Sequence, residues 1–273
     1  MTEQKVAAHY SRGTLEDKIL AALRSAGKDL EHLSTADLEG IDDLHVGGRK
    51  ATETLAGLMG LREGMHLLDA GSGLGGPARF FAESGHRVTG VDLTEEFVRM
   101  ADKLTRLVKL DALAQFRQGS VLELPFDPGT FDAAYMIHVG MNIRDKAGLC
   151  REVARVLKPG ARFAIFDILR HGDQPVAFPL PWAQTAETDF AAGAEEYRMA
   201  LEAAGMRIDH QRGQRDFAIA FMKRMMERAA AAPGPVAGMQ LLMGEQAPAM
   251  LMNVMAAIES GAMEPVELVA SKN

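Results

Sequence analysis

The sequence predicts an α/β protein with a doubly wound, mostly parallel sheet of seven strands, and three observations support this fold class. Short apolar segments alternate with segments of helical periodicity, an order typical of parallel strands joined by right-handed crossovers. A cluster of glycines directly follows the first apolar segment, where open sheets of the Rossmann-like kind bind their ligands. Of the 273 residues, 47% are hydrophobic and 25% are charged, which suits a domain with a substantial core.

Seven segments fit strands by their length and apolar character. In chain order they are His66–Asp69, Arg87–Asp92, Gln115–Arg117, Phe131–Ile137, Arg162–Ile168, Met206–Gln211 and Pro265–Ser271. Before the fifth strand, a type II turn is expected at Lys158-Pro159-Gly160, because Pro and Gly take the positions that this turn prefers. Late in the chain, helices are expected at Phe217–Ala232 and Gly238–Ile258.

The chain is expected to form one domain, residues 1–273, because the last strand should return to the sheet. Its three parts are an N-terminal helical cap, a cofactor-binding core, and a lid with a helical insertion before the last strand, at residues 1–63, 64–168 and 169–273. The irregular, proline-containing connection after Ile168 is of the length that usually forms a lid or binding loop.

Composition and charge exclude several function classes. A net charge of −7 argues against a nucleic-acid partner, which requires a basic face. One cysteine, Cys150, excludes an internal disulfide, and eight scattered histidines show no metal-ligand spacing. No apolar leader is evident, and the apolar stretch Val236–Ile258 is interrupted by Glu245, Gln246 and Pro248, so we expect no membrane span. We therefore expect a cytoplasmic protein, with homodimer formation left open.

The stretch LLDAGSGLGG, Leu67–Gly76, is the feature around which the sequence is organised. It predicts a buried strand, a tight glycine turn and the start of a helix. Glycine is needed where the backbone has positive φ or where a ligand must approach it closely. The spacing Gly71-x-Gly73-x-x-Gly76 alone would favour a dinucleotide site. The same stretch also fits Asp69-x-Gly71-x-Gly73-x-Gly75, with an acid before the first glycine.

Two further candidates follow other predicted strands. Asp92 ends the second strand, 21 residues after Gly71, where an acid can accept hydrogen bonds from both hydroxyls of a ribose. His138 stands at the end of the fourth strand, in the stretch YMIHVGMN. A structural helix cap for Asp92 and an ordinary loop histidine for His138 are the alternative interpretations.

These motifs resemble those of class I S-adenosylmethionine-dependent methyltransferases. The resemblance rests on Asp69–Gly76, Asp92, GSVLELPFDPGTFD at Gly119–Asp132 and VLKPGARFAIFD at Val156–Asp167. DDLHVGG before the sheet, GVDLTEEFV and HVGMNI are similar to the small-molecule branch around sarcosine/dimethylglycine and ubiquinone-biosynthesis methyltransferases. The resemblance covers about residues 40–170 and is weak beyond them.

The resemblance implies that S-adenosyl-L-methionine is the cofactor and that its binding residues follow the first four strands. Residues shaping the pocket for its amino-acid part would be Asp69, Gly71, Ser72, Gly73 and Gly75. Asp92 would hold the ribose, with Leu93 against the adenine and Ser120 and Val121 beside it. Ser120 replaces the acid that many members carry, which leaves backbone contacts from Val121. His138 would lie near the methyl group.

Methyl transfer is an in-line displacement in which the sulfonium leaves as a neutral thioether, so alignment is the main requirement. A base is needed only for a protonated nucleophile, and an imidazole that titrates near neutrality suits that role. His138 is the first candidate and His45 the second, while no metal is expected. The best prediction for the acceptor is an amine nitrogen. The alternative is C- or O-methylation of a hydrophobic quinone-, phenol- or natural-product-type acceptor, and a remote alternative is an NAD-dependent oxidoreductase.

Acceptor contacts are expected from variable segments. The candidates are Tyr10, Met141, Asn142 and Trp182. Eleven of the 17 methionines lie from Met199 onward, and methionine lines apolar surfaces that adapt to a partner. Either these residues fill a core, or this helical insertion and the loop around Trp182 close over the pocket and exclude water.

Overall fold

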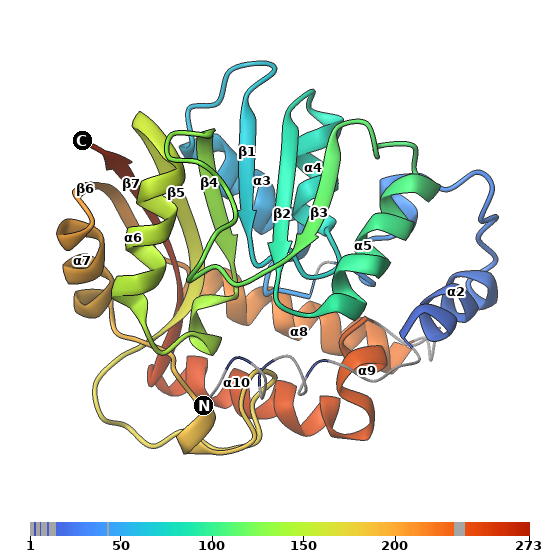
Figure 1. The fold of residues 1–273 in the computed structure, drawn as a ribbon. Helices are drawn as coiled ribbons and strands as arrows, with labels where there is room; N and C mark the ends of the chain where they lie inside the picture. The colour runs from blue at the N-terminus through green and yellow to red at the C-terminus, as the bar shows by residue number, and fades with distance from the viewer. Residues whose placement is uncertain (1–2, 4–5, 7–9, 11–14, 43, 232–237) are drawn as a thin grey trace.

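The computed structural model describes residues 3, 6, 10, 15–42, 44–231 and 238–273. Its centre is a seven-stranded sheet in the order β3-β2-β1-β4-β5-β7-β6 (Figure 1). The strands are β1 His66–Ala70, β2 Arg87–Asp92, β3 Ala114–Gln118, β4 Phe131–Ile137, β5 Leu157–Arg170, β6 Met206–Gly213 and β7 Met263–Lys272. Only β7 runs antiparallel to its neighbours, β5 and β6, so the predicted α/β class and mostly parallel sheet are confirmed.

Helices cover both faces of the sheet, as doubly wound topology requires. On one face, α6 and α7 pack over strand residues that include Leu68. On the other face, α3, α4 and α5 pack over residues that include Leu67. Because successive residues of a strand face opposite sides, this neighbouring pair supplies both cores. The helices are α2 Leu15–Ser25, α3 Gly48–Leu58, α4 Gly76–Glu83, α5 Glu95–Leu107, α6 Lys146–Val156, α7 Ala194–Ala203, α8 Arg215–Ala231, α9 Gly238–Met243 and α10 Ala247–Ser260.

Two predicted elements differ in detail. The residues predicted as a turn, Lys158–Gly160, lie within β5, but Gly160 has a φ of 74°. There the pairing of β4 with β5 shifts register, from Phe131 opposite Leu157 to Ala133 opposite Arg162. The turn signal thus produces a bulge rather than a chain reversal. The single helix expected over Gly238–Ile258 is divided into α9 and α10 by a 3-10 turn, Gly244–Gln246.

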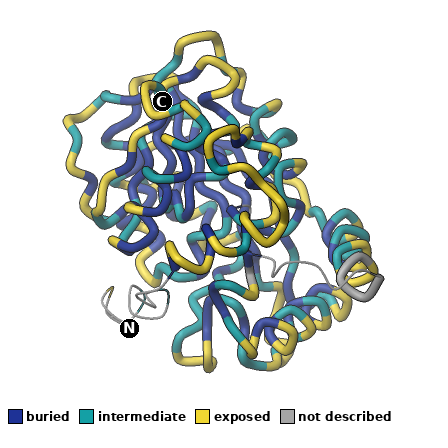
Figure 2. Tube along the Cα trace, turned by 90° about the vertical axis from the view of Figure 1, so that its right-hand side faces the viewer, coloured by how far each residue is buried: buried dark blue, intermediate teal, exposed yellow. Residues whose placement is uncertain are grey.

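The N-terminal helices and the C-terminal insertion meet at the carboxyl ends of the parallel strands. Figure 1 shows α8, α9 and α10 across these lower ends of the strands, and in Figure 2 the buried residues gather in the interior of the molecule. One buried cluster joins α2 and α9 to Leu74 of the glycine loop and Phe97 of α5. A second joins Trp182 of the 171–193 loop to α8 and α10. Because both clusters combine distant parts of the chain, we propose that it forms one domain.

The segment Gln240–Ser260 is long and apolar enough to cross a membrane by length and composition alone, which is weak evidence for a membrane span. In the folded chain 44% of its most apolar window is buried. Met250, Val254 and Ile258 pack in the same clusters as the helical cap and Trp182. An apolar core helix passes the same composition test, and the segment serves here as a wall of the domain.

Candidate active site

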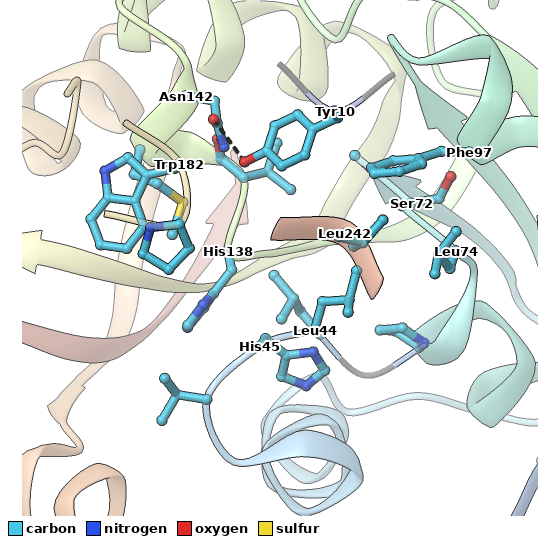
Figure 3. A pocket seen from close by; sticks show the side chains of 18 of the residues that line it. Tyr10, Leu44, His45, Ser72, Leu74, Phe97, His138, Asn142, Trp182 and Leu242 are labelled. Atoms are coloured by element: carbon cyan, nitrogen blue, oxygen red, sulfur yellow. Dashed lines mark hydrogen bonds between the residues drawn. The ribbon is translucent and has the colours of Figure 1, made fainter. Parts of the chain in front are cut away.

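A cavity of about 1480 Å³ opens at the carboxyl ends of β1, β2 and β4. Ligand pockets in proteins usually measure about 300–1,000 Å³, so this one can hold two ligands side by side. Its lining combines the turns after these strands with the loop around His45 and the C-terminal helices. Every candidate site residue predicted from the sequence, except Gly75, lines it. Figure 3 shows ten labelled side chains around the space.

The glycine loop after β1 requires left-handed backbone at three positions. Gly71, Gly73 and Gly75 have φ values of 88°, 51° and 80°. A side chain at Gly71 would collide with Val139, because its Cβ would lie 2.4 Å from Cγ2. At Gly73 nothing lies within 4 Å of such a Cβ, and the residue faces the cavity. Gly71 and Gly75 are therefore required by packing, while Gly73 leaves room for a ligand.

Asp92 connects this loop to the next strand. Its Oδ2 accepts a hydrogen bond from Gly73 N at 2.8 Å, and Oδ1 accepts one from Thr94 N at 2.9 Å. Burial raises the pKa of Asp92, and these hydrogen bonds oppose the rise. Each carboxylate oxygen has a second lone pair, so ribose hydroxyls can still donate to it. The functional and helix-capping interpretations of Asp92 therefore apply together.

Asp69, one residue before the end of β1, has a buried carboxyl group that lacks a full set of partners. Its Oδ2 accepts no hydrogen bond from the residues that the structure describes, and the residue is 2% exposed. Burial raises its pKa to about 7, the charge of Asp92 adds to the rise, and Tyr135 and Arg79 oppose it. Ser72 Oγ, on the next turn, is likewise buried without a partner among the described residues. Buried polar atoms normally have partners, so these two point to a polar ligand.

His138 and His45 lie next to each other on the cavity wall, with ring centroids 6.0 Å apart (Figure 3). His138 has left-handed backbone with a φ of 54°, which is uncommon for a residue with a side chain and is often found at functional sites. Its Nε2 is buried and makes no hydrogen bond within the described part of the chain. His45 Nε2 lies 3.0 Å from Gly48 O, which fixes the ring.

Both imidazoles are neutral at physiological pH. Burial lowers the pKa of His138 well below 6.5, and the charge of His45 lowers it further. Burial lowers the pKa of His45 to about 4. The expectation that His138 titrates near neutrality is therefore wrong, because the sequence does not show how completely the ring is desolvated.

Two residues of the N-terminal segment, Glu3 and Tyr10, also line the cavity. Ser120 Oγ, beside Val121, donates a hydrogen bond to the Glu3 carboxylate. Tyr10 Oη donates one to Asn142 Oδ1 at 3.2 Å, as the dashed line in Figure 3 shows. The Tyr10 ring lies 5.6 Å from that of Phe97. Met141 is 2% exposed and Leu93 lines the cavity beside Asp92.

Two buried networks were not predicted. Arg79 of α4 contacts the glycine loop, Asp42 and α5, as described below. Asp167 Oδ2 accepts a hydrogen bond from Tyr197 Oη at 2.6 Å, and both atoms lie under the turn after β4. A Cβ at Gly140 of that turn would lie 1.8 Å from this hydroxyl oxygen. Asp167 belongs to a quoted motif, but only the three-dimensional structure shows its contact with Tyr197.

The C-terminal helices and the loop around Trp182 line one side of the cavity, the side on which the second interpretation of the methionines places the acceptor. The residues are Pro181, Trp182, Phe221, Met222, Arg224, Met225, Gln240, Leu242, Met243, Leu251 and Val254. Trp182 Nε1 donates a hydrogen bond to Asp189 Oδ1 at 2.9 Å, and Arg170 forms an ion pair with the same carboxylate. The lid is thus fixed on the cavity by a buried carboxylate.

Trp182→Ala is expected to raise the acceptor KM by about tenfold or more, because it removes a large apolar surface from that wall. The Kd of S-adenosylmethionine should change less than about threefold, since Trp182 lies away from the glycine loop. Trp182→Phe retains the apolar wall and loses the bond to Asp189, so it separates packing from lid anchoring. Steady-state kinetics and calorimetry measure the two effects. A cofactor Kd that weakens as much as the acceptor KM would contradict this placement.

Comparison with known proteins relates the central part of the chain to methyltransferases. Residues 68–165 match the family model described as a methyltransferase domain. A relative in Oryza sativa subsp. japonica, cycloartenol-C-24-methyltransferase 1, is 36% identical over 114 residues, which cover 41% of this chain and 33% of that protein. The chain thus spans about a third of the length of the curated relatives it matches.

Solved structures share the fold over almost the whole chain. Geranyl diphosphate C-methyltransferase from Streptomyces coelicolor A3(2) has a TM-score of 0.72 at 20% identity, covering 99% of this chain and 98% of that one. A putative sarcosine dimethylglycine methyltransferase from Galdieria sulphuraria has a TM-score of 0.68 at 16% identity, covering 94% and 98%. The [4+2]-cyclase SpnF has a TM-score of 0.71 at 23% identity, covering 100% and 97%. Such similarity shows the fold, and one fold can support many different reactions.

Proposed function

Because residues 68–165 match a methyltransferase domain, we propose that this chain uses S-adenosylmethionine to methylate an apolar small molecule presenting a hydroxyl or carbon nucleophile. The observation that carries the proposal is the acceptor wall, which is apolar except for Arg224 and Gln240. The amine nitrogen preferred from the sequence is not confirmed. The second prediction, C- or O-methylation of a hydrophobic acceptor, fits this wall better.

The loops after β1 and β2 suit S-adenosylmethionine. The cofactor ammonium can donate to the orphaned Asp69 Oδ2, and its sulfonium chain can pass the open face of Gly73. Ribose hydroxyls can donate to Asp92, and Leu93 and Val121 offer apolar contacts to the adenine. The donors and acceptors of the site therefore complement those of the cofactor.

An amine acceptor would need different surroundings. An amine is charged at neutral pH, and burying a cation requires a paired carboxylate. No carboxylate occurs in the wall formed by the described lid and helices α8 to α10. A neutral, apolar acceptor gains free energy from the same burial, about 25 cal/mol per Å² of apolar surface. This wall therefore favours a neutral acceptor, although carboxylates that include Glu39 and Asp145 line other parts of the same cavity.

The main contribution of the protein to the reaction is to align the acceptor with the methyl group of the cofactor. When bound, S-adenosylmethionine supplies an electrophilic methyl group whose sulfur leaves as a neutral thioether. Trp182 and the methionine-lined wall hold the acceptor and exclude water. For a hydroxyl acceptor, His138 Nε2 is buried, neutral and free of described partners, so it can accept the hydroxyl proton as the oxygen–carbon bond forms. His45 lies beside that ring and lowers its pKa further, which favours the neutral form of His138.

With a hydroxyl acceptor, we expect the rate of methyl transfer to be independent of pH near neutrality. The pKa of His138 lies well below 6.5, so the unprotonated base is fully present at pH 7 and is lost only as the pH falls through that lower pKa. His138→Gln should lower kcat by about a hundredfold and remove the acid limb. A parent rate that rises through pH 6.5 to 7.5 and is unchanged in shape by the variant would contradict this account.

Cofactor binding should release a proton from Asp69. In the free protein its pKa is about 7, so at pH 6.5 the carboxyl group is mostly protonated. The cofactor ammonium favours the ionised form, and binding at pH 6.5 should release more than about half a proton. The affinity should therefore rise with pH up to about 7 and then level off. Calorimetry in buffers of different ionisation enthalpy measures the release, and Asp69→Asn should abolish it; equal release in both proteins would refute the assignment.

Methyl transfer from labelled S-adenosylmethionine to a panel of neutral apolar alcohols, phenols, quinols and alkenes tests the proposed function. Small zwitterionic amines, including sarcosine and dimethylglycine, serve as the contrasting group. We expect labelled product only in the apolar group. Transfer confined to the amines would overturn the acceptor class, and cofactor binding without any transfer would indicate a non-methylating use of this fold.

A further inference from the structure

Arg79 is a fully buried cation that no step of the proposed reaction uses. It lies in the first turn of α4 and is 1% exposed. Its Nη2 donates to Leu74 O of the glycine loop at 2.7 Å and to Asp42 Oδ2 at 2.6 Å. Its Nη1 donates to Thr105 Oγ1 of α5 at 3.0 Å. One guanidinium thus joins the loop that faces the cofactor to a segment on the acceptor side.

The segment that contains Asp42 leads directly to His45. The Asp42 side chain is 6% exposed, and three residues later His45 is fixed against Gly48 O. His45, Val46 and Gly48 line the same cavity as Gly73. Leu74 of the glycine loop and the segment that leads to His45 are therefore hydrogen-bonded to the same guanidinium nitrogen.

Stability alone does not account for this arrangement. A cation in the first turn opposes the helix dipole, which favours negative charge there. Arg79 Nε is buried without a hydrogen-bond partner among the described residues, which is a further cost. Apolar side chains in place of a buried ion pair are often neutral or stabilising. The guanidinium does supply what an apolar side chain cannot, a directional link between two separate segments.

We infer that Arg79 and Asp42 are positioning residues that couple cofactor binding at the glycine loop to the placement of His45 beside His138. This inference rests on the proposed function in one respect, that the glycine loop binds S-adenosylmethionine. Coupling is reciprocal, so an acceptor that settles the His45 segment also strengthens cofactor binding. The chain then assembles its acceptor side around His138 when the cofactor is present.

Histidine-selective NMR of the full chain tests the link, with S-adenosylhomocysteine as the ligand and His45→Gln to assign the His45 signal. In the parent, the His45 signal should move as the ligand saturates. In Arg79→Met/Asp42→Leu, which exchanges the pair for apolar side chains, the ligand should still bind but most of this movement should be lost. Lys158→Met/Asp132→Leu is the matched control, because it removes an ion pair outside the cavity lining and should retain the movement.

The outcomes separate the two proposals. No ligand binding to the parent would refute the proposed function. Binding with equal His45 movement in the parent and the double variant would refute the link, because a direct effect of the ligand on the ring survives the exchange. If the double variant does not fold, Arg79→Gln removes the buried cation together with the guanidinium that bonds both Leu74 and Asp42. It should then reduce the His45 movement, and an unchanged movement would equally refute the link.

Discussion

Gly73→Val should abolish measurable binding of S-adenosylmethionine while the sheet remains folded. A side chain at Gly73 meets no protein atom within 4 Å and projects into the cavity, so it occupies space that the cofactor needs. The φ of 51° adds strain for a β-branched residue, of about 1–3 kcal/mol. Calorimetry should detect no binding heat, and circular dichroism should show the parent's secondary structure.

Gly64→Val is the matched control for this variant. Gly64 also has positive φ, at 75°, and no atom within 4 Å of an added Cβ, but it does not line the cavity. The control should lose similar stability and bind the cofactor normally. Cofactor affinity in Gly73→Val within threefold of the parent would show that the loop does not approach the ligand.

Asp92→Ala should weaken S-adenosylmethionine binding by tens- to hundreds-fold. A hydrogen bond to a charged group contributes about 1.5–3 kcal/mol, and each 1.4 kcal/mol is a factor of ten in Kd. Part of the loss comes from the loop itself, because Asp92 also accepts the hydrogen bond from Gly73 N. Calorimetry gives the change in Kd.

Asp132→Ala provides the comparison, since Asp132 also accepts a backbone hydrogen bond, from His66 N at 2.8 Å, outside the cavity lining. It should leave the Kd within about threefold of the parent. A change of less than threefold in Asp92→Ala as well would mean that Asp92 only caps α5 and fixes the loop.

The fold was predictable because its signals are local. Strands β2 and β4 have the predicted bounds, and the glycine pattern placed the cavity at the end of β1. The exceptions occur where tertiary pairing overrides a local signal. Lys158–Gly160 carries turn residues, yet pairing with β4 draws it into β5 as a bulge. By contrast, the break between α9 and α10 follows local signals that the prediction of one continuous helix did not use, because Gly244 has a φ of 64° and Pro248 lies in the first turn of α10.

The sequence predicted residues that line the cavity, but it did not predict their electrostatics. Asp69, Asp92 and His138 lie where motif spacing placed them, while the pKa values of Asp69 and His138 depend on burial that the sequence does not show. Arg79 was missed because an arginine on a short amphipathic helix usually faces solvent. Its partner Asp42 lies 37 residues away, and no local spacing connects them.

Parallel calorimetric titrations of the parent protein with S-adenosylmethionine and with NAD test the central claim most directly. The claim is that the glycine loop and Asp92 form a site for S-adenosylmethionine rather than a dinucleotide. We expect one-to-one binding of S-adenosylmethionine, which Gly73→Val abolishes, and no binding heat with NAD. Saturable binding of NAD together with no response to S-adenosylmethionine would contradict the account.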